Sequence, residues 1–156
     1  MTQMPFQLKT AKQMIVFIGI QASGKTSFYR SFLEGAGYVH INLDTLHTRN
    51  KENLAIQACY TNGQSFVVDN TNPEKADRAR YIPDAREHGY EVIGIFFQST
   101  LKDCISRNEM RENKVPQIAI PAVQNRLQMP EYAEGFDQLY FVRIKQDDFL
   151  ITEWRE

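Results

Sequence analysis

The sequence has little of what would place the protein in a membrane or a secretory pathway. No apolar run approaches the roughly 20 residues that span a bilayer, and residues 1–12 lack the apolar stretch of a signal peptide. Only 2 cysteines occur in 156 residues, Cys59 and Cys104, and their separation fits no metal-binding motif. We therefore expect a cytoplasmic protein without a membrane partner, whose cysteines are thiols of the core.

An excess of charge of one sign is also lacking. The chain has 18 basic and 19 acidic residues, which give a net charge of −1. This balance argues against a broad surface that coats nucleic acid, but it is compatible with a site that grips one strand end through a few phosphates. Internal repeats and low-complexity linkers are absent as well, so we expect one domain over residues 1–156, with a core at about 13–145 and a tail at 146–156.

A phosphate-binding pattern stands near the start of the chain. Residues 19–26, GIQASGKT, fit G-x-x-x-x-G-K-[ST] at every fixed position. An apolar run at 14–18 precedes them and a segment with helical spacing follows, and both flanks argue against a chance match. Main-chain amides of such a loop cradle phosphates, while Lys25 would reach the β- and γ-phosphates and the Thr26 hydroxyl would hold Mg²⁺. The residues expected to bind ATP here are Gly19, Ile20, Gln21, Ala22, Ser23, Gly24, Lys25, Thr26 and Ser27.

Strand and helix patterns alternate along the rest of the chain. Apolar runs predict further strands at 38–42, 65–69, 91–97 and 139–144. Helices are expected to about residue 34, then at 45–60, 72–88, 100–111 and 122–128, with Asn72 as a cap and Pro83 as a kink or division. The alternation predicts an α/β, three-layer P-loop NTPase fold with a mostly parallel sheet of about five strands and a small helical lid.

The helical segment at 72–88 has a balanced charge that predicts a solvated face rather than a nucleic-acid patch. Its charged residues are Glu74, Asp77, Asp84 and Glu87 against Lys75, Arg78, Arg80 and Arg86.

Two aspartates follow predicted strands. In an open α/β sheet the carboxyl ends of the strands form the ligand edge, so Asp44 should emerge beside the phosphate loop. Its alternative role is the N-cap of the next helix. Asp69 closes the run SFVVD, a Walker-B-like element, and we expect it to position Mg²⁺ together with Thr26.

Two arginines predict a lid over the triphosphate. Arg107 and Arg111 are four residues apart and therefore share one helix face. Arg107 is expected to bind the nucleotide, and Arg111 to stabilise charge on the transferred phosphoryl group. The alternative is that Arg107 pairs with Asp103, and Arg111 with Glu109 or Glu112, as surface ion pairs.

The remaining pattern favours a small phosphotransferase. A GTPase would need an Asn-Lys-x-Asp element, and residues 113–116, NKVP, lack its aspartate. A motor ATPase usually couples its site to further domains or a ring, which this sequence does not display.

Several runs together resemble the kinase domain of polynucleotide kinase-phosphatases, over about residues 13–145. Besides the phosphate loop, these runs are INLD at 41–44, VDNTNP at 68–73, RARY at 78–81, RNxxR at 107–111, KVP at 114–116 and AEGF at 133–136. The resemblance implies a P-loop kinase that transfers the γ-phosphate of ATP to a 5′-hydroxyl of DNA or RNA. It further implies that Asp44 is the general base, that Lys25 and Thr26 hold phosphate and Mg²⁺, and that Arg111 is the lid arginine.

The sequence departs from that family at the acceptor side. Leu43 stands where the family usually has arginine, and His47 stands where a phage relative has an arginine for the acceptor phosphate. Arg49 or Lys51 could substitute, and no Asp-x-Asp phosphatase signature is present. A small-molecule or nucleoside kinase therefore stays an alternative, as does a non-catalytic ATP-binding regulator suggested by the apolar tail.

Overall fold

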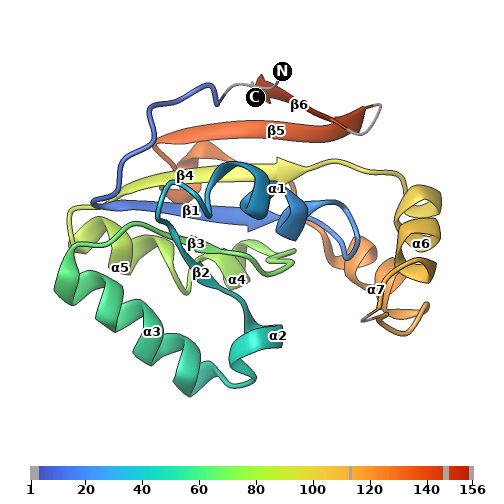
Figure 1. The fold of residues 1–156 in the computed structure, drawn as a ribbon, viewed down its shortest axis with the longest axis horizontal. Coiled ribbons are helices and arrows are strands. Elements are labelled where there is room, and N and C mark those ends of the chain that lie inside the picture. Colours follow the sequence, from blue (N-terminus) through green and yellow to red (C-terminus); the bar gives the residue numbers. More distant parts are fainter. Residues whose placement is uncertain (1–3, 113, 146–147, 155–156) are drawn as a thin grey trace.

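Six strands form one sheet in the computed structural model, which describes residues 4–112, 114–145 and 148–154. Their spatial order is β2-β3-β1-β4-β5-β6, and the first five are parallel while β6 runs antiparallel to β5 (Figure 1). The strands are β1 Gln13–Ile18, β2 Val39–Ile41, β3 Phe66–Val68, β4 Glu91–Phe97, β5 Gln138–Lys145 and β6 Asp148–Glu153. The mostly parallel α/β sheet expected from the sequence is thus confirmed, with one strand more than the five predicted.

Short helices connect the strands. They are α1 Lys25–Phe32, α2 Leu43–Leu46, α3 Arg49–Asn62, α4 Lys75–Arg78, α5 Ile82–Glu87, α6 Leu101–Glu109 and α7 Ala119–Arg126, with a 3₁₀ turn at Tyr132–Glu134. None of these described helices has the length and apolar character needed to cross a bilayer.

Strand β1 lies at the centre of the core, and all six of its residues are buried. Met14, Val16 and Ile18 point to the face covered by α3 and α5, whereas Ile15 and Phe17 point to the opposite face with Phe28 of α1. A parallel strand covered on both faces is expected to be a continuous apolar run, which explains residues 14–18; Gln13 at its start is buried with its side-chain amide hydrogen-bonded to Gln7 O and Glu91. The layers place α1 on one side of the sheet and α3–α5 on the other (Figure 1).

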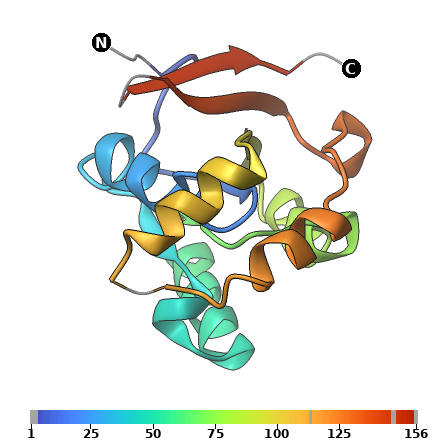
Figure 2. The same ribbon diagram turned by 90° about the vertical axis from the view of Figure 1, so that its right-hand side faces the viewer.

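The carboxyl ends of the parallel strands form the edge that carries the phosphate loop. Helices α6 and α7 lie beyond the ends of β1 and β4 (Figure 1), and the view along the sheet shows α6 crossing in front of this edge (Figure 2). Ile20 of the loop packs with Cys104 of α6 and Ile120 of α7, which joins the lid to the loop.

Several expected element boundaries were wrong. The helix predicted at 45–60 is divided, because His47 has φ 71° and Thr48 caps α3. Asn72 caps no helix; its φ is 45°, its side-chain amide donates to Phe17 O at 2.9 Å, and α4 begins after Glu74. Helix α6 ends at Glu109 rather than 111, so Arg111 lies just beyond it.

The tail at 148–153 forms a strand at the sheet edge. Phe149 and Ile151 pack on the α1 side of the core, and Trp154 packs on the other side. These apolar side chains, which suggested a partner surface, are therefore used in part by the fold itself.

Arg78 contradicts the prediction of a solvated face for residues 72–88. Its side chain is fully buried, and its guanidinium donates to the Glu134 carboxylate at 2.8 and 3.1 Å and to main-chain carbonyls including those of Asn72 and Pro73. Two runs that carried the family resemblance, RARY and AEGF, thus meet through one buried ion pair, and Arg78 also bonds to the end of a third, VDNTNP. Gly135 completes the junction with φ 111°, where an added Cβ would lie 2.7 Å from Ile82 Cγ2.

Candidate active site

The phosphate loop offers main-chain donors that nothing else uses. Among the described residues, no N–H group of residues 21–26 donates a hydrogen bond. The buried Gln21 Oε1 and Ser23 Oγ likewise lack a partner within the described chain. Because unpaired donors at a buried helix start are costly, the free N–H groups and the Ser23 hydroxyl indicate a site built for an anionic ligand at the start of α1.

Left-handed backbone gives the loop its curvature. Ala22 has φ 62° and Gly24 has φ 99°. A Cβ at Gly24 would lie 2.8 Å from Ile144 Cδ1, so both the backbone conformation and the close approach of β5 require glycine there.

Lys25 is buried inside the loop, with an exposed fraction of 8%. Its Nζ donates to Gly19 O at 3.0 Å and to Ile20 O at 2.7 Å. Burial lowers the pKa of Lys25 from 10.5 to about 8, and the negative charge of Asp69 opposes this shift. An ammonium group held among carbonyls and short of anionic partners is suited to bind a phosphate.

The lowered pKa of Lys25 predicts a pH-dependent stability without nucleotide. The unfolded chain keeps the Lys25 proton up to about pH 10.5, whereas the folded chain releases it near pH 8. Burial of the charged ammonium therefore lowers the free energy of unfolding by its full amount below pH 8, and this loss disappears as the pH rises to 10.5. Relative to Lys25→Met, the parent should gain about 2 kcal/mol in free energy of unfolding between pH 7 and pH 10. Urea titrations at both pH values measure this difference; an unchanged difference would contradict a lowered pKa.

Thr26 and Asp69 meet below the loop. The Thr26 hydroxyl donates to Asp69 Oδ2 at 2.8 Å, and His40 Nε2 lies 2.7 Å from the same oxygen. The His40 ring stacks on Tyr29 of α1 with centroids 4.2 Å apart. A hydroxyl and a carboxylate oxygen side by side are hard donors of the type that Mg²⁺ accepts when phosphates and water complete its shell, so these residues fit the expected cation.

Asp44 lies on α2, opposite the loop, and it does not cap the helix. The N-cap is Asn42, whose side chain accepts from Thr45 N at 3.3 Å. Asp44 is exposed, lines the same cavity as Lys25 and opposes the lowering of the Lys25 pKa through its charge. Its carboxylate is therefore available to a ligand, and the capping alternative is wrong.

The lid arginines differ from each other. One Arg107 nitrogen donates to Ala22 O and to Ser99 Oγ, both at 2.9 Å, so this side chain ties α6 to the phosphate loop. Arg111 has no hydrogen-bond or ion-pair partner within the described part of the chain. The surface pairs considered from the sequence do not form, and the half-buried Arg111 guanidinium faces the cavity unpaired.

These side chains surround a cavity of ≈ 620 Å³. The predicted site residues along its wall are Gln21, Ala22, Gly24, Lys25, Thr26, Ser27, Asp44, Asp69, Arg107 and Arg111. Gly19 and Ile20 contribute carbonyls to Lys25 from behind the wall, and Ser23 is buried there. His47, Arg49 and Lys51, the candidates for the acceptor phosphate, do not line it.

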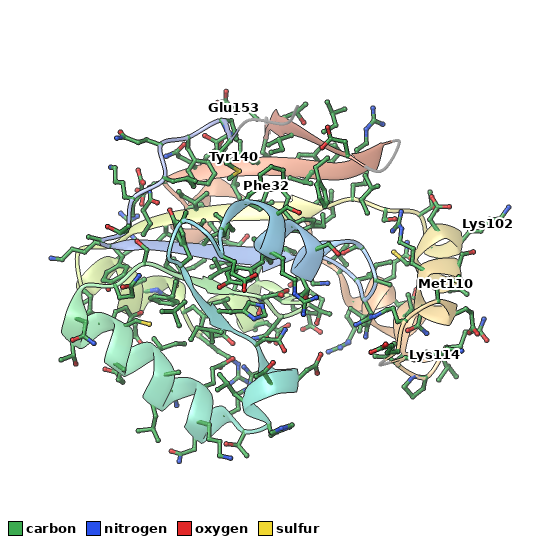
Figure 3. The ribbon with its side chains drawn as sticks, viewed as in Figure 1. Phe32, Lys102, Met110, Lys114, Tyr140 and Glu153 are labelled. Atoms are coloured by element: carbon green, nitrogen blue, oxygen red, sulfur yellow. The ribbon has the colours of Figure 1, made fainter. Side chains whose placement is uncertain are left out.

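Sequence reasoning missed several residues of the wall. They are Asn42, Leu43, Asn70, Thr71, Met110, Val115 and Ile144. Met110 has an exposed fraction of 87% and lies with Lys114 at the far end of α6, whereas Lys102 points away from the body of the protein (Figure 3). Asn42 had a usable signal, since asparagine before a helical turn is a preferred N-cap. Ile144 had none, because only the tertiary structure brings β5 to the loop.

The family model described as an AAA domain matches residues 14–130. The chain belongs to this family. The match covers the phosphate loop, both aspartates and the lid arginines, and family and fold together imply a P-loop kinase domain that binds nucleotide.

Two curated relatives extend the family assignment. A Schizosaccharomyces pombe protein named bifunctional polynucleotide phosphatase/kinase is 30% identical over 148 residues, covering 90% of this chain and 36% of the relative. A protein of Acanthamoeba polyphaga mimivirus, whose name also contains bifunctional polynucleotide phosphatase/kinase, is 32% identical over 150 residues, or 91% of this chain and 36% of that protein. The chain thus spans about a third of the length of these relatives.

Solved structures of several P-loop proteins share the fold. Chaetomium thermophilum Kti12, solved in complex with ADP-AlF₃, aligns with a TM-score of 0.64 at 19% identity, over 87% of this chain and 91% of that one. A gluconokinase from Sinorhizobium meliloti aligns with a TM-score of 0.60 at 19% identity, over 88% and 86%. At this identity the likeness concerns the architecture alone.

Proposed function

We propose that the protein is a Mg²⁺-dependent kinase that transfers the γ-phosphate of ATP to the 5′-hydroxyl end of a nucleic acid. The observation that carries the proposal is the exposed carboxylate of Asp44, which has no hydrogen-bond or ion-pair partner among the described residues and lines the same cavity as Lys25 and the phosphate loop. The names of the relatives, which match about 90% of this chain, support a polynucleotide as the acceptor.

The proposed reaction uses the residues around the cavity as follows. Loop amides and Lys25 hold the phosphates of ATP, and Asp44 orients the acceptor hydroxyl and takes its proton. The hydroxyl oxygen forms a bond to the γ-phosphorus as the bond from that phosphorus to the β–γ bridging oxygen breaks, and ADP leaves. Thr26 and Asp69 would hold Mg²⁺, which supplies positive charge to the phosphates when bound. Arg111 stabilises charge that develops on the transferred group.

An acceptor screen tests the proposal. ATP labelled at the γ-phosphate is incubated with 5′-hydroxyl DNA and RNA oligonucleotides, the same oligonucleotides carrying a 5′-phosphate, nucleosides and gluconate. Label should pass only to the 5′-hydroxyl oligonucleotides, and their KM should rise with salt because a polyanion is bound. Transfer to none of them while ATP still binds would remove the proposal.

A small-molecule hydroxyl kinase is the second candidate. The acceptor side favours it, because Leu43 is apolar and the candidates for the acceptor phosphate, His47, Arg49 and Lys51, do not line the cavity. This candidate predicts transfer to a neutral acceptor with little dependence of KM on salt, which the same screen measures.

Arg111→Ala should slow turnover more than it weakens ATP binding. The unpaired guanidinium is expected to act on charge present mainly in the transition state, so kcat should fall by about tenfold to a hundredfold while the Kd for ATP changes by less than about threefold. Steady-state kinetics and calorimetry separate the two quantities. Arg126→Ala, on α7 and paired with Glu74 at 3.6 Å, is the control that should alter neither. A change confined to ATP affinity would make Arg111 a binding residue.

A further inference from the structure

The helix that carries Asp44 is short and only partly covered, with Leu46 at its end packed against the face of the core that α3 and α5 cover. Helix α2 contains four residues, Leu43–Leu46, and none of them is buried. A single helical turn is unstable in isolation, because the first turn fixes several residues for one hydrogen bond. His47 follows with φ 71°, so the chain turns away at once. Besides the packing of Leu46, the position of the Asp44 carboxylate therefore depends on the hydrogen bonds at the start of α2.

Two asparagines fix that start to the end of β3. Asn42 Nδ2 donates to Asp69 O at 2.7 Å. Asn70 Oδ1 accepts from the main-chain N–H of Leu43 at 3.0 Å. The second bond is made next to Asp44 itself, so the side-chain orientation of Asn70 bears directly on the helix that carries the carboxylate.

The orientation of the Asn70 amide is set by Glu52. Asn70 Nδ2 donates to Glu52 Oε2 at 3.0 Å, and an ionised carboxylate can only accept hydrogen bonds. With the amide reversed, its oxygen would face the carboxylate, acceptor against acceptor, and its NH₂ group would face the Leu43 N–H, donor against donor. The Glu52 carboxylate therefore favours the orientation in which Asn70 bonds to α2.

Glu52 is itself held rigidly from two sides. Its exposed fraction is 2%, and Oε1 accepts from the Tyr81 hydroxyl and from Arg49 Nη1, both at 2.9 Å. Arg49 Nη1 also donates to the Tyr81 hydroxyl at 2.7 Å. Burial raises the pKa of Tyr81 to about 12, which keeps this hydroxyl protonated as a donor. A buried carboxylate with donors on both oxygens is held in one position, so it accepts from the Asn70 amide in one fixed direction.

We infer that Glu52 is a positioning residue for phosphoryl transfer, acting through Asn70 to aim the Asp44 carboxylate into the cavity. Glu52 does not line the cavity and touches neither the loop nor Asp44. The inference rests on the proposed function, since it assigns to Asp44 the handling of the acceptor hydroxyl.

The first experiment compares Glu52→Gln with the parent in steady-state transfer to the accepted hydroxyl substrate. A glutamine at 52 can present its own NH₂ to Asn70, so residue 52 no longer selects the Asn70 orientation and only the N–H of Leu43 still favours it. We expect kcat to fall by about tenfold or more, as for loss of an outer residue that orients a catalytic group, with the KM for ATP changed by less than about twofold.

A double mutant then separates positioning from general loss of structure. If Glu52 acts through Asp44, Glu52→Gln should lower kcat by less than about twofold in an Asp44→Asn background. Two effects that multiply would mean that Glu52 supports activity by another route, and would overturn the inference.

Glu134→Gln is the matched control for the loss of a buried, arginine-paired carboxylate. Glu134 accepts from Arg78 at 2.8 Å and does not line the cavity, so its variant should melt at a lower temperature while its kcat stays within about twofold of the parent. An equal loss of kcat in both glutamine variants would overturn the inference.

Should Glu52→Gln fail to fold, Tyr81→Phe removes one donor to Glu52 with the ring retained. Its control is Tyr90→Phe, whose hydroxyl lies 3.0 Å from Cys59 O and Gln64 O, away from the cavity. Tyr81→Phe should lower kcat by more than about threefold and Tyr90→Phe should not; equal kcat values would overturn the inference. An active parent with unaffected variants removes this inference alone, whereas a parent that phosphorylates no acceptor removes the proposed function as well.

Discussion

Lys25→Met is expected to lower phosphoryl transfer by about 10²–10³-fold or more and to weaken ATP binding. Methionine keeps an unbranched side chain of similar length but removes the ammonium group. That ammonium donates to the carbonyls of Gly19 and Ile20, which are neutral acceptors that it can exchange for phosphate oxygens when ATP enters. Calorimetry with ATP and steady-state transfer assays measure the two effects.

Lys102→Met is the matched control for this substitution. Lys102 is exposed on α6 and points away from the body of the protein, outside the residues that form the cavity wall (Figure 3). Its variant should bind ATP and turn over like the parent. A Lys25→Met protein that keeps more than about a tenth of the parental rate would contradict the role proposed for the ammonium group.

The sheet was the most predictable part of the fold. Strand β4 was expected at 91–97 and is found at Glu91–Phe97, because residues 92–97 are apolar apart from one glycine and lie between Glu91 and Gln98. The sequence did not reveal β6. Leu150, with an exposed fraction of 38%, interrupts the alternation that Phe149 and Ile151 would otherwise display.

The ligand edge was predictable for a different reason. Once strands and helices alternate, topology alone brings the ends of β1, β2 and β3 together, so Lys25, Asp44 and Asp69 were expected to meet and they line one cavity. What those side chains do in a reaction stays a prediction that the kinetic experiments have to test.

Local charge patterns gave the poorest guidance. Arg78 stands among eight charged residues and was expected at a solvated face, yet it is fully buried because its partner Glu134 lies 56 residues further along the chain. The break at His47 was hidden in a similar way, since it occurs without glycine or proline, in a left-handed conformation that histidine adopts only occasionally. A partner distant in the sequence decides the first feature, and the backbone conformation of one residue decides the second.

The anchoring of α2 belongs to the same class of features. Glu52, Asn70 and Tyr81 come from three separate segments, and no spacing in the sequence connects them. The run VDNTNP is distinctive in the sequence, but the sequence does not show what its Asn70 binds. In the structure Asn70 links the main chain of Leu43 to the carboxylate of Glu52. Distinctive runs can thus mark structural junctions as well as catalytic groups.

Asp44→Asn should lower turnover by about 10²-fold or more and leave ATP binding within about twofold of the parent. Asparagine has nearly the shape of aspartate, but its neutral amide accepts a proton from the acceptor hydroxyl far less readily. Asn42 is the N-cap of α2, so the substitution removes no capping bond, and a lowered rate can be assigned to the carboxylate. Steady-state kinetics with saturating ATP and calorimetry without acceptor provide the two measurements.

Asp103→Asn supplies the comparison that this assignment needs. Asp103 also lies in the first turn of a capped helix, α6, where both aspartates interact favourably with the helix dipole. It is exposed and does not line the cavity, so its variant should match the parent in turnover while losing the same charge. If Asp44→Asn turns over at the parental rate, the acceptor proton must leave by another route, and the kinase mechanism proposed around this carboxylate is wrong.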